Sequence, residues 1–132
     1  MSEPEKKYKV IIVDDDDFLV NMYATKFSHS GVTIEACKVG GSLLEKLRAG
    51  EKADLILLDI IMPNMSGLEV LKQMREQKIG EGIPVVMLTN QNDEEDINEA
   101  KKLGVAGYIV KSAATPTEVV NEVMTIIKTS QV

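Results

Sequence analysis

The chain has 132 residues, of which 44% are apolar, so it is the size of one domain and can bury a core without disulfides. Its formal charge of −6 argues against tight direct binding to nucleic acid or to an anionic membrane, because both reward clustered Lys and Arg. No run reaches the roughly 18 apolar residues of a membrane span, and the polar start lacks the apolar core of a signal peptide. We therefore expect a cytoplasmic protein.

Short apolar runs of strand length alternate with longer amphipathic segments along the chain. The strand candidates are residues 10–13, 32–37, 55–58, 85–88 and 108–110. This alternation predicts an α/β fold in which helices cover both faces of a parallel sheet. Residues 32–36 alternate between apolar and polar side chains, whereas the other runs are continuously apolar, so the second strand is expected at an edge of the sheet.

Three predicted helices begin with a capping box, in which Ser or Thr is followed three residues later by Glu. Apolar side chains at helical spacing follow in the first and last helices, at 19–27 and 119–127. The segment 93–103 is mostly charged, so we expect a lightly anchored, movable helix there. The capping pairs are Ser42 with Glu45, Ser66 with Glu69, and Thr115 with Glu118, and Pro116 stands at the favoured first helical position.

Polar side chains stand at the points where four of the predicted strands end. The carboxyl ends of parallel strands meet at one edge of a sheet, and this edge is where doubly wound folds bind their ligands. We therefore expect these side chains to converge on one site. Asp14 follows the first strand, with Asp15 beside it, Asp59 follows the third, Thr89 the fourth and Lys111 the fifth.

Three carboxylates at one sheet edge need a shared proton or a cation. Two like charges ~4 Å apart repel by roughly 4 kcal/mol at an effective dielectric of 20. Oxygen ligands beside a lysine point to Mg²⁺. With the charge neutralised, Asp59 would attack phosphorus while Lys111 and Thr89 hold the phosphoryl oxygens. Taken alone, an Asp or Thr after a strand more commonly begins a turn or caps a helix, and Asp16 and Asp17 are interpreted in that way.

At four places the sequence closely resembles the response regulator receiver family. The motifs are IIVDDD at 11–16, LLDIIMPNMSG at 57–67, VMLT at 86–89 and GYIVK at 107–111. Each motif is weak alone, but their order and spacing together are specific. The resemblance extends over residues 7–127, so we expect one receiver domain across 1–132 with short polar tails. It implies a flavodoxin-like (βα)5 fold with strand order 2-1-3-4-5.

The resemblance also implies a function in two-component phosphorelay signalling, with the domain acting as a phosphoacceptor that assists its own phosphorylation and dephosphorylation. Asp59 would accept a phosphoryl group from the phosphohistidine of a sensor histidine kinase or a phosphotransfer protein. Asp15, Asp59 and the backbone carbonyl of Ile61 would bind Mg²⁺ directly, with Asp14 reaching it directly or through water. Lys111 would pair with the phosphoryl group.

A switch in the protein's surface is implied as well. Thr89 would swing toward the phosphoryl group, and Tyr108 would turn inward to fill the space. This would change the surface made by the fourth helix, fifth strand and fifth helix, where a protein target or an output domain of a longer regulator would bind. Receivers of this kind act as monomers or as phosphorylation-dependent dimers.

The sequence departs from the family pattern near the expected site. Ser112 stands where the family usually has proline after the lysine, so the loop is either trans or strained. Asn90 is larger than the usual residue after the threonine and would alter access to Asp59. Ile61 and Gln91 occupy the positions that vary the path of hydrolytic water. Because Ile61 cannot orient a water molecule, we hypothesise that the phosphorylated form is long-lived.

Other functions are weighed on the same residues. A phosphatase of the haloacid dehalogenase type needs a second Asp two positions after the nucleophile, where this chain has Ile61. A flavin binder would meet repulsion between its phosphate and residues 14–17. The alternative that stays open is a receiver-like interaction module with impaired phosphorylation, which Ser112 makes conceivable. His29 is interpreted as a solvated helix-end residue and Cys37 as a small packed side chain.

Overall fold

A computed structural model describes residues 7–90 and 93–130 of the chain. The strands are β1 (Tyr8–Val13), β2 (Val32–Cys37), β3 (Leu55–Asp59), β4 (Val85–Thr89) and β5 (Gly107–Val110). The helices are α1 (Asp17–Ser28), α2 (Gly40–Arg48), α3 (Gly67–Gln77), α4 (Glu94–Lys102) and α5 (Pro116–Ser130), with a short 3-10 turn η1 (Lys111–Ala113) before α5. Every predicted strand is present, with ends that differ by two residues at most.

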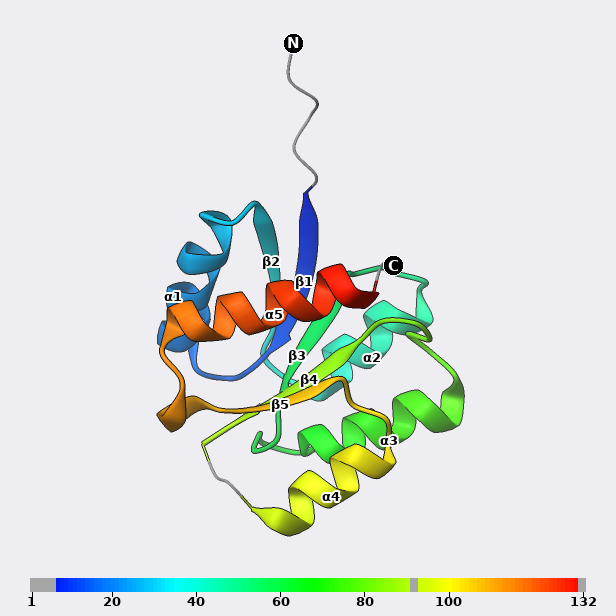
Figure 1. Cartoon of the computed structure of the whole chain (residues 1–132). Helices are drawn as coiled ribbons and strands as arrows, with labels where there is room; N and C mark the ends of the chain where they lie inside the picture. Colours follow the sequence, from blue (N-terminus) through cyan, green and yellow to red (C-terminus); the bar gives the residue numbers. More distant parts are fainter. Residues whose placement is uncertain (1–6, 91–92, 131–132) are drawn as a thin grey trace.

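The strands form one parallel sheet in the order β2-β1-β3-β4-β5, which is the expected flavodoxin-like order. Figure 1 shows α1 and α5 lying together over one face of this sheet, with α2, α3 and α4 on the other side. The second predicted strand, β2, is at the edge, as its alternating pattern indicated. None of the helices among the described residues has the length and apolar character that crossing a membrane would need.

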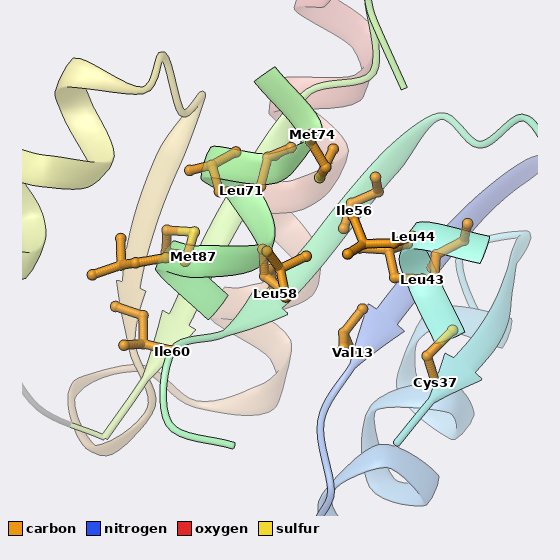
Figure 2. Packing of buried hydrophobic residues seen from close by; sticks show 14 of the residues in the cluster. Val13, Cys37, Leu43, Leu44, Ile56, Leu58, Ile60, Leu71, Met74 and Met87 are labelled. Carbon is orange, nitrogen blue, oxygen red and sulfur yellow. The ribbon is translucent and has the colours of Figure 1, made fainter. Parts of the chain in front are cut away.

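The central strands are apolar at every position because both of their faces are buried. In β1, for example, Ile11 and Val13 point into the core beneath α2 and α3, whereas Val10 and Ile12 point into the core beneath α1 and α5. Figure 2 shows the first of these cores, in which labelled side chains of β1, β3 and β4 meet those of α2 and α3. Cys37 is packed at the margin of this core, as expected.

The predicted start of α2 is wrong. Ser42 lies inside the helix, which begins at Gly40 after the extended residue Val39 and has no side-chain cap. The backbone N–H of Ser42 donates to the carbonyl of Val39, so the first helical turn forms earlier than the capping signal suggested. The first residue of the helix packs closely on α3, since a Cβ on Gly40 would collide with Val70.

The other two capping predictions are confirmed. The Ser66 hydroxyl accepts a hydrogen bond from the backbone N–H of Glu69 at 3.2 Å. Thr115 and Glu118 cap each other, because each backbone N–H donates to the other's side chain, at 3.0 and 3.1 Å. Pro116 is the first residue of α5, and His29 is the exposed residue that ends α1. These caps fix the helix ends that face the carboxyl edge of the sheet.

A cluster of charged side chains covers the edge strand β2 on the α2 side. Lys9 Nζ lies 3.2 Å from Glu35 Oε2 and 2.8 Å from Glu51 Oε1. Lys46 of α2 contacts the same two carboxylates, at 3.3 and 3.6 Å. The cluster joins β1, β2, α2 and the loop after α2 through alternating charges.

Candidate functional site

An acidic cavity of about 420 Å³ opens at the carboxyl edge of the sheet. Its walls come from the loops that follow β1, β3, β4 and β5, as the strand-end argument predicts. Asp14 and Asp59 are brought together because β1 and β3 are neighbours whose last paired residues are Val13 and Leu58. The residues that line the cavity are Asp14, Asp15, Asp16, Asp59, Ile61, Asn90 and Lys111.

Three carboxylates, those of Asp14, Asp15 and Asp59, each offer an oxygen, and these oxygens all lie within 4.8 Å of one another. Asp14 and Asp59 are buried, with 1% and 6% of their surfaces exposed, whereas Asp15 is exposed. Two buried carboxylates at this separation repel strongly in the absence of nearby positive charge. Hard oxygen donors with one open, solvated side match the coordination that Mg²⁺ prefers, so the residues present fit this metal.

Lys111 supplies the positive charge at this site. Its Nζ lies 2.6 Å from Asp14 Oδ2 and 3.6 Å from Asp59 Oδ2, and its side chain is only 9% exposed. Two hydrogen bonds to neighbouring backbone groups fix Asp14 further, because its N–H donates to the carbonyl of Cys37 and its Oδ1 accepts from the N–H of Asp16. The lysine is therefore held mainly by Asp14 and only loosely by Asp59.

The environment of Asp59 raises the pKa of its carboxyl from 3.8 to about 6. Burial is the largest cause, and the negative charges of Asp14 and Asp15 act in the same direction. Lys111 and the backbone N–H of Ile61, which donates to Oδ1 at 3.4 Å, oppose the rise without cancelling it. A cation bound among these carboxylates would lower this pKa, because it stabilises the ionised form.

Thr89 and Tyr108 lie outside the lining of the cavity. Thr89 is the last residue of β4 and is 1% exposed, and its side chain is hydrogen-bonded to the Tyr108 phenol. Burial raises the pKa of Tyr108, and the charges of Asp96 and Asp93 raise it further. The tyrosine is thus half-buried between the end of β4 and the start of α4, and the threonine hydroxyl is directed to Tyr108.

The loop after β3 alternates between buried and exposed side chains. Ile60 and Met62 are buried, whereas Ile61 projects outward with 58% of its surface exposed and lines the cavity. Gly67, at the start of α3, was not predicted as a site residue. Its N–H donates to the carbonyl of Ile60 at 2.8 Å, and a Cβ there would collide with the backbone carbonyl of Asp59. In the sequence it is a glycine directly after a helix cap, at the end of the LLDIIMPNMSG motif.

The loop after β5 answers the question raised by Ser112. No cis peptide bond occurs in the described part of the chain, so the Lys111–Ser112 bond is trans. The loop forms η1, whose first residue, Lys111, lines the cavity. The chain then continues to the cap of α5. Asn90 also lines the cavity, while Gln91 lies outside the described residues. Asp16 caps α1, as expected, and also reaches the cavity wall.

Known proteins share both the sequence pattern and the fold. The family model described as the response regulator receiver domain matches residues 10–123. The alkaline phosphatase synthesis transcriptional regulatory protein PhoP of Bacillus subtilis is 34% identical over 124 residues, which cover 94% of this chain and 50% of PhoP. The response regulator SaeR of Staphylococcus aureus is 32% identical over 111 residues, covering 84% of this chain and 46% of SaeR.

A solved structure extends the similarity to three dimensions. The receiver domain of Francisella response regulator 1452 superposes with a TM-score of 0.83 at 27% identity, covering 94% of this chain and 99% of that domain. The chain spans about half the length of the curated relatives PhoP and SaeR, so the likeness concerns one part of those proteins. Together with the strand order and the acidic cavity, these matches show that the chain belongs to the response regulator receiver family.

Proposed function

We propose that Asp59 accepts a phosphoryl group from the phosphohistidine of a sensor histidine kinase or a phosphotransfer protein. The observation that carries this proposal is the convergence of Asp14, Asp15 and Asp59 with Lys111 in one cavity. Phosphoryl transfer to a carboxylate requires an anionic nucleophile, ligands for a metal ion and an ammonium group that binds phosphate. Here these groups come from separate loops. Membership of the family supports the same reading.

In the transfer step, one carboxylate oxygen of Asp59 attacks phosphorus in line with the P–N bond of the phosphohistidine. The O–P bond forms as the P–N bond breaks, and the imidazole leaves with the electron pair and takes up a proton. When bound, Mg²⁺ supplies the charge neutralisation that lets an anionic carboxylate approach an anionic phosphoryl group. Asp15, Asp59 and the Ile61 carbonyl would hold this ion, with Asp14 binding it directly or through water.

Lys111 changes partners in this proposal. In the unphosphorylated protein its ammonium is closest to Asp14, at 2.6 Å. A phosphoryl group on Asp59 brings more negative charge within reach of the same ammonium, so Lys111 binds a phosphoryl oxygen. The exchange needs little movement, because Nζ already lies 3.6 Å from Asp59 Oδ2.

Thr89 and Tyr108 carry the change to the surface. For the Thr89 hydroxyl to reach the phosphoryl group, it must leave its hydrogen bond with Tyr108. The freed tyrosine then turns inward, and the surface formed by α4, β5 and α5 changes for a protein target or for another domain of a longer regulator. The charges of Asp93 and Asp96 near the phenol link this step to the start of α4.

Phosphorylation with a small phosphodonor tests the proposal directly. The protein is incubated with acetyl phosphate and Mg²⁺, and its intact mass is recorded. We expect one added phosphoryl group in the wild type and in Asp17→Asn, an exposed control, and none in Asp59→Asn or after chelation of Mg²⁺. A wild type that gains no mass under these conditions would instead favour a receiver-like interaction module with impaired phosphorylation.

A further inference from the structure

Arg75 links the last turn of α3 to the C-terminal end of α4. Its Nε donates to the carbonyl of Leu103 at 2.7 Å, and its Nη2 donates to the carbonyl of Gly104 at 3.3 Å. Leu103 is the C-cap of α4, and Gly104 follows it with a left-handed φ of +79°. The guanidinium therefore satisfies carbonyls that the end of a helix leaves without partners inside the helix.

The charge of Arg75 suits this position. The C-terminal end of a helix carries a partial negative charge, so a half-buried guanidinium there is attracted as well as hydrogen-bonded. The planar fork also reaches two successive carbonyls, which a single ammonium cannot do with fixed geometry. Neither contact involves a carboxylate, so both of these donors are committed to the backbone after α4.

The rest of α4 is lightly held. Its only buried residue among those described is Ala100, and its first turn consists of the acidic residues Glu94, Glu95 and Asp96. Asp93 caps that turn with its own side chain, through hydrogen bonds that stay within the helix. Of the residues 93–99, five are exposed, and only Asp96 and Ile97 are partly buried.

The two ends of α4 thus differ in how they are fixed. At the C-terminal end, Arg75 acts beside the hydrogen bond from Val105 to Ala100, and the next N–H, that of Ala106, donates to Val85 of β4 at 2.8 Å. The N-terminal end follows the loop after Thr89 and lies near Tyr108, since Asp93 and Asp96 act on the tyrosine's pKa. Few contacts to the core mean a low free energy of local opening at that end.

We propose that Arg75 is a positioning residue that fixes the C-terminal end of α4, so that phosphorylation moves the N-terminal end about this point. The first half of the proposal concerns the unphosphorylated protein alone. The second half rests on the proposed function, because it needs a phosphoryl group on Asp59. In this lever motion, phosphorylation turns α4 about its fixed C-terminal end, and the largest displacement is at the N-terminal end, next to Thr89 and Tyr108.

Amide hydrogen exchange, resolved by mass spectrometry of peptides, tests the first half. In the unphosphorylated protein, Arg75→Met should speed exchange at residues 103–106 by about tenfold, because two charge-assisted hydrogen bonds are lost. Arg75→Lys keeps a charge at the helix end but lacks the fork, so its exchange should be intermediate. Lys72→Met removes an exposed positive charge three residues earlier on α3 and serves as the control. Unchanged exchange at 103–106 in both Arg75 variants overturns the first half.

The second half is tested by the same measurement with acetyl phosphate and Mg²⁺, with the intact mass recorded in parallel. In the wild type, exchange should change at residues 94–98 and stay nearly constant at 103–106. In Arg75→Met the change should extend over both segments. Equal changes at both ends of wild-type α4 overturn the lever. If no adduct forms on Asp59, the lever fails together with the proposed function, while the unphosphorylated comparison still decides the role of Arg75.

Discussion

Lys111 Nζ lies 2.6 Å from Asp14 Oδ2, a contact between residues 97 positions apart in the chain. The pair is nearly dry, because the lysine side chain is 9% exposed and the aspartate side chain 1%. Removing one member of a buried pair leaves the other charge without compensation, and that cost exceeds what the intact pair contributes. The pair therefore holds the loop after β5 against the loop after β1, in the wall of the acidic cavity.

We expect Lys111→Met to lower the free energy of unfolding by about 3 kcal/mol at pH 7 without Mg²⁺, because Asp14 and Asp59 lose their cation. Urea denaturation followed by circular dichroism measures the loss. Saturating Mg²⁺ should restore part of it. The control is Lys38→Met, since Lys38 and Asp17 form an exposed pair with 69% and 65% of their side chains accessible. That variant should lose less than about 1 kcal/mol. Equal losses would argue against a buried charge pair.

Asp59 makes the stability of the metal-free protein depend on pH. Its folded pKa of about 6 lies above the ordinary value of 3.8. The stabilising contribution of the protonated carboxyl is therefore complete below pH 3.8 and is lost as the pH rises through 6. At pH 7.5 without Mg²⁺, Asp59→Asn should be more stable than the wild type by about 1–2 kcal/mol.

Urea denaturation between pH 4 and pH 8 measures this dependence. The advantage of Asp59→Asn should shrink toward pH 4 and on addition of Mg²⁺, which stabilises the ionised carboxylate of the wild type. Glu45→Gln, a change at an exposed carboxylate of α2, is the control and should show no such trend. If the wild type had a higher free energy of unfolding than Asp59→Asn at pH 7.5 without metal, the ionised Asp59 carboxylate would not be destabilised by its surroundings.

Gly67 should tolerate no side chain, because a Cβ would collide with the backbone carbonyl of Asp59. We expect Gly67→Ala to lower the free energy of unfolding by about 2 kcal/mol and to slow phosphorylation, since Asp59 must shift. The matched control is Gly41→Ala in α2, where a Cβ meets nothing within 4 Å. That change should raise stability by about 0.5–1 kcal/mol. Urea midpoints and adduct formation decide the matter, and similar results for both glycines would refute the close approach.

Ile61 should lengthen the life of the phosphorylated protein. The residue is 58% exposed and lines the cavity, yet its side chain has no atom that can orient a water molecule. Ile61→Asn introduces such an atom and should speed loss of the phosphoryl group by about tenfold, whereas Ile61→Val should not. The adduct is formed, the donor is removed, and the intact mass is followed with time. Faster loss in the wild type than in Ile61→Asn would sink the idea.

The convergence of site residues could be predicted because strand ends obey a simple rule. Asp14, Asp59 and Lys111 each follow a continuously apolar run, and parallel strands end at the same edge. The edge position of β2 followed from its alternating pattern for a related reason, since only central strands are buried on both faces. The alternation of apolar and polar residues and the ends of apolar runs are local properties of the sequence, so they can be recognised without knowledge of the tertiary structure.

Features that depend on contacts between helices could not be predicted. Ser42 carries a good capping signal, but α2 begins at Gly40, a residue that packs closely against Val70 of α3. The contact of Arg75 with the end of α4 joins residues 28 positions apart and depends on how the two helices lie side by side. Nor did the sequence indicate that Lys111 would be closer to Asp14 than to Asp59. Such preferences are set by side-chain geometry.

The charged cluster on β2 bears on how the protein behaves at high concentration. An open strand edge invites sheet extension by a neighbouring chain, the first step toward aggregation. Here Glu35 is held between Lys9 and Lys46, so an incoming strand would place its side chains beside fixed charges that it cannot easily desolvate. The cluster therefore protects that edge from pairing with another chain, and replacing its charged side chains with neutral ones should make this chain prone to form fibrous assemblies.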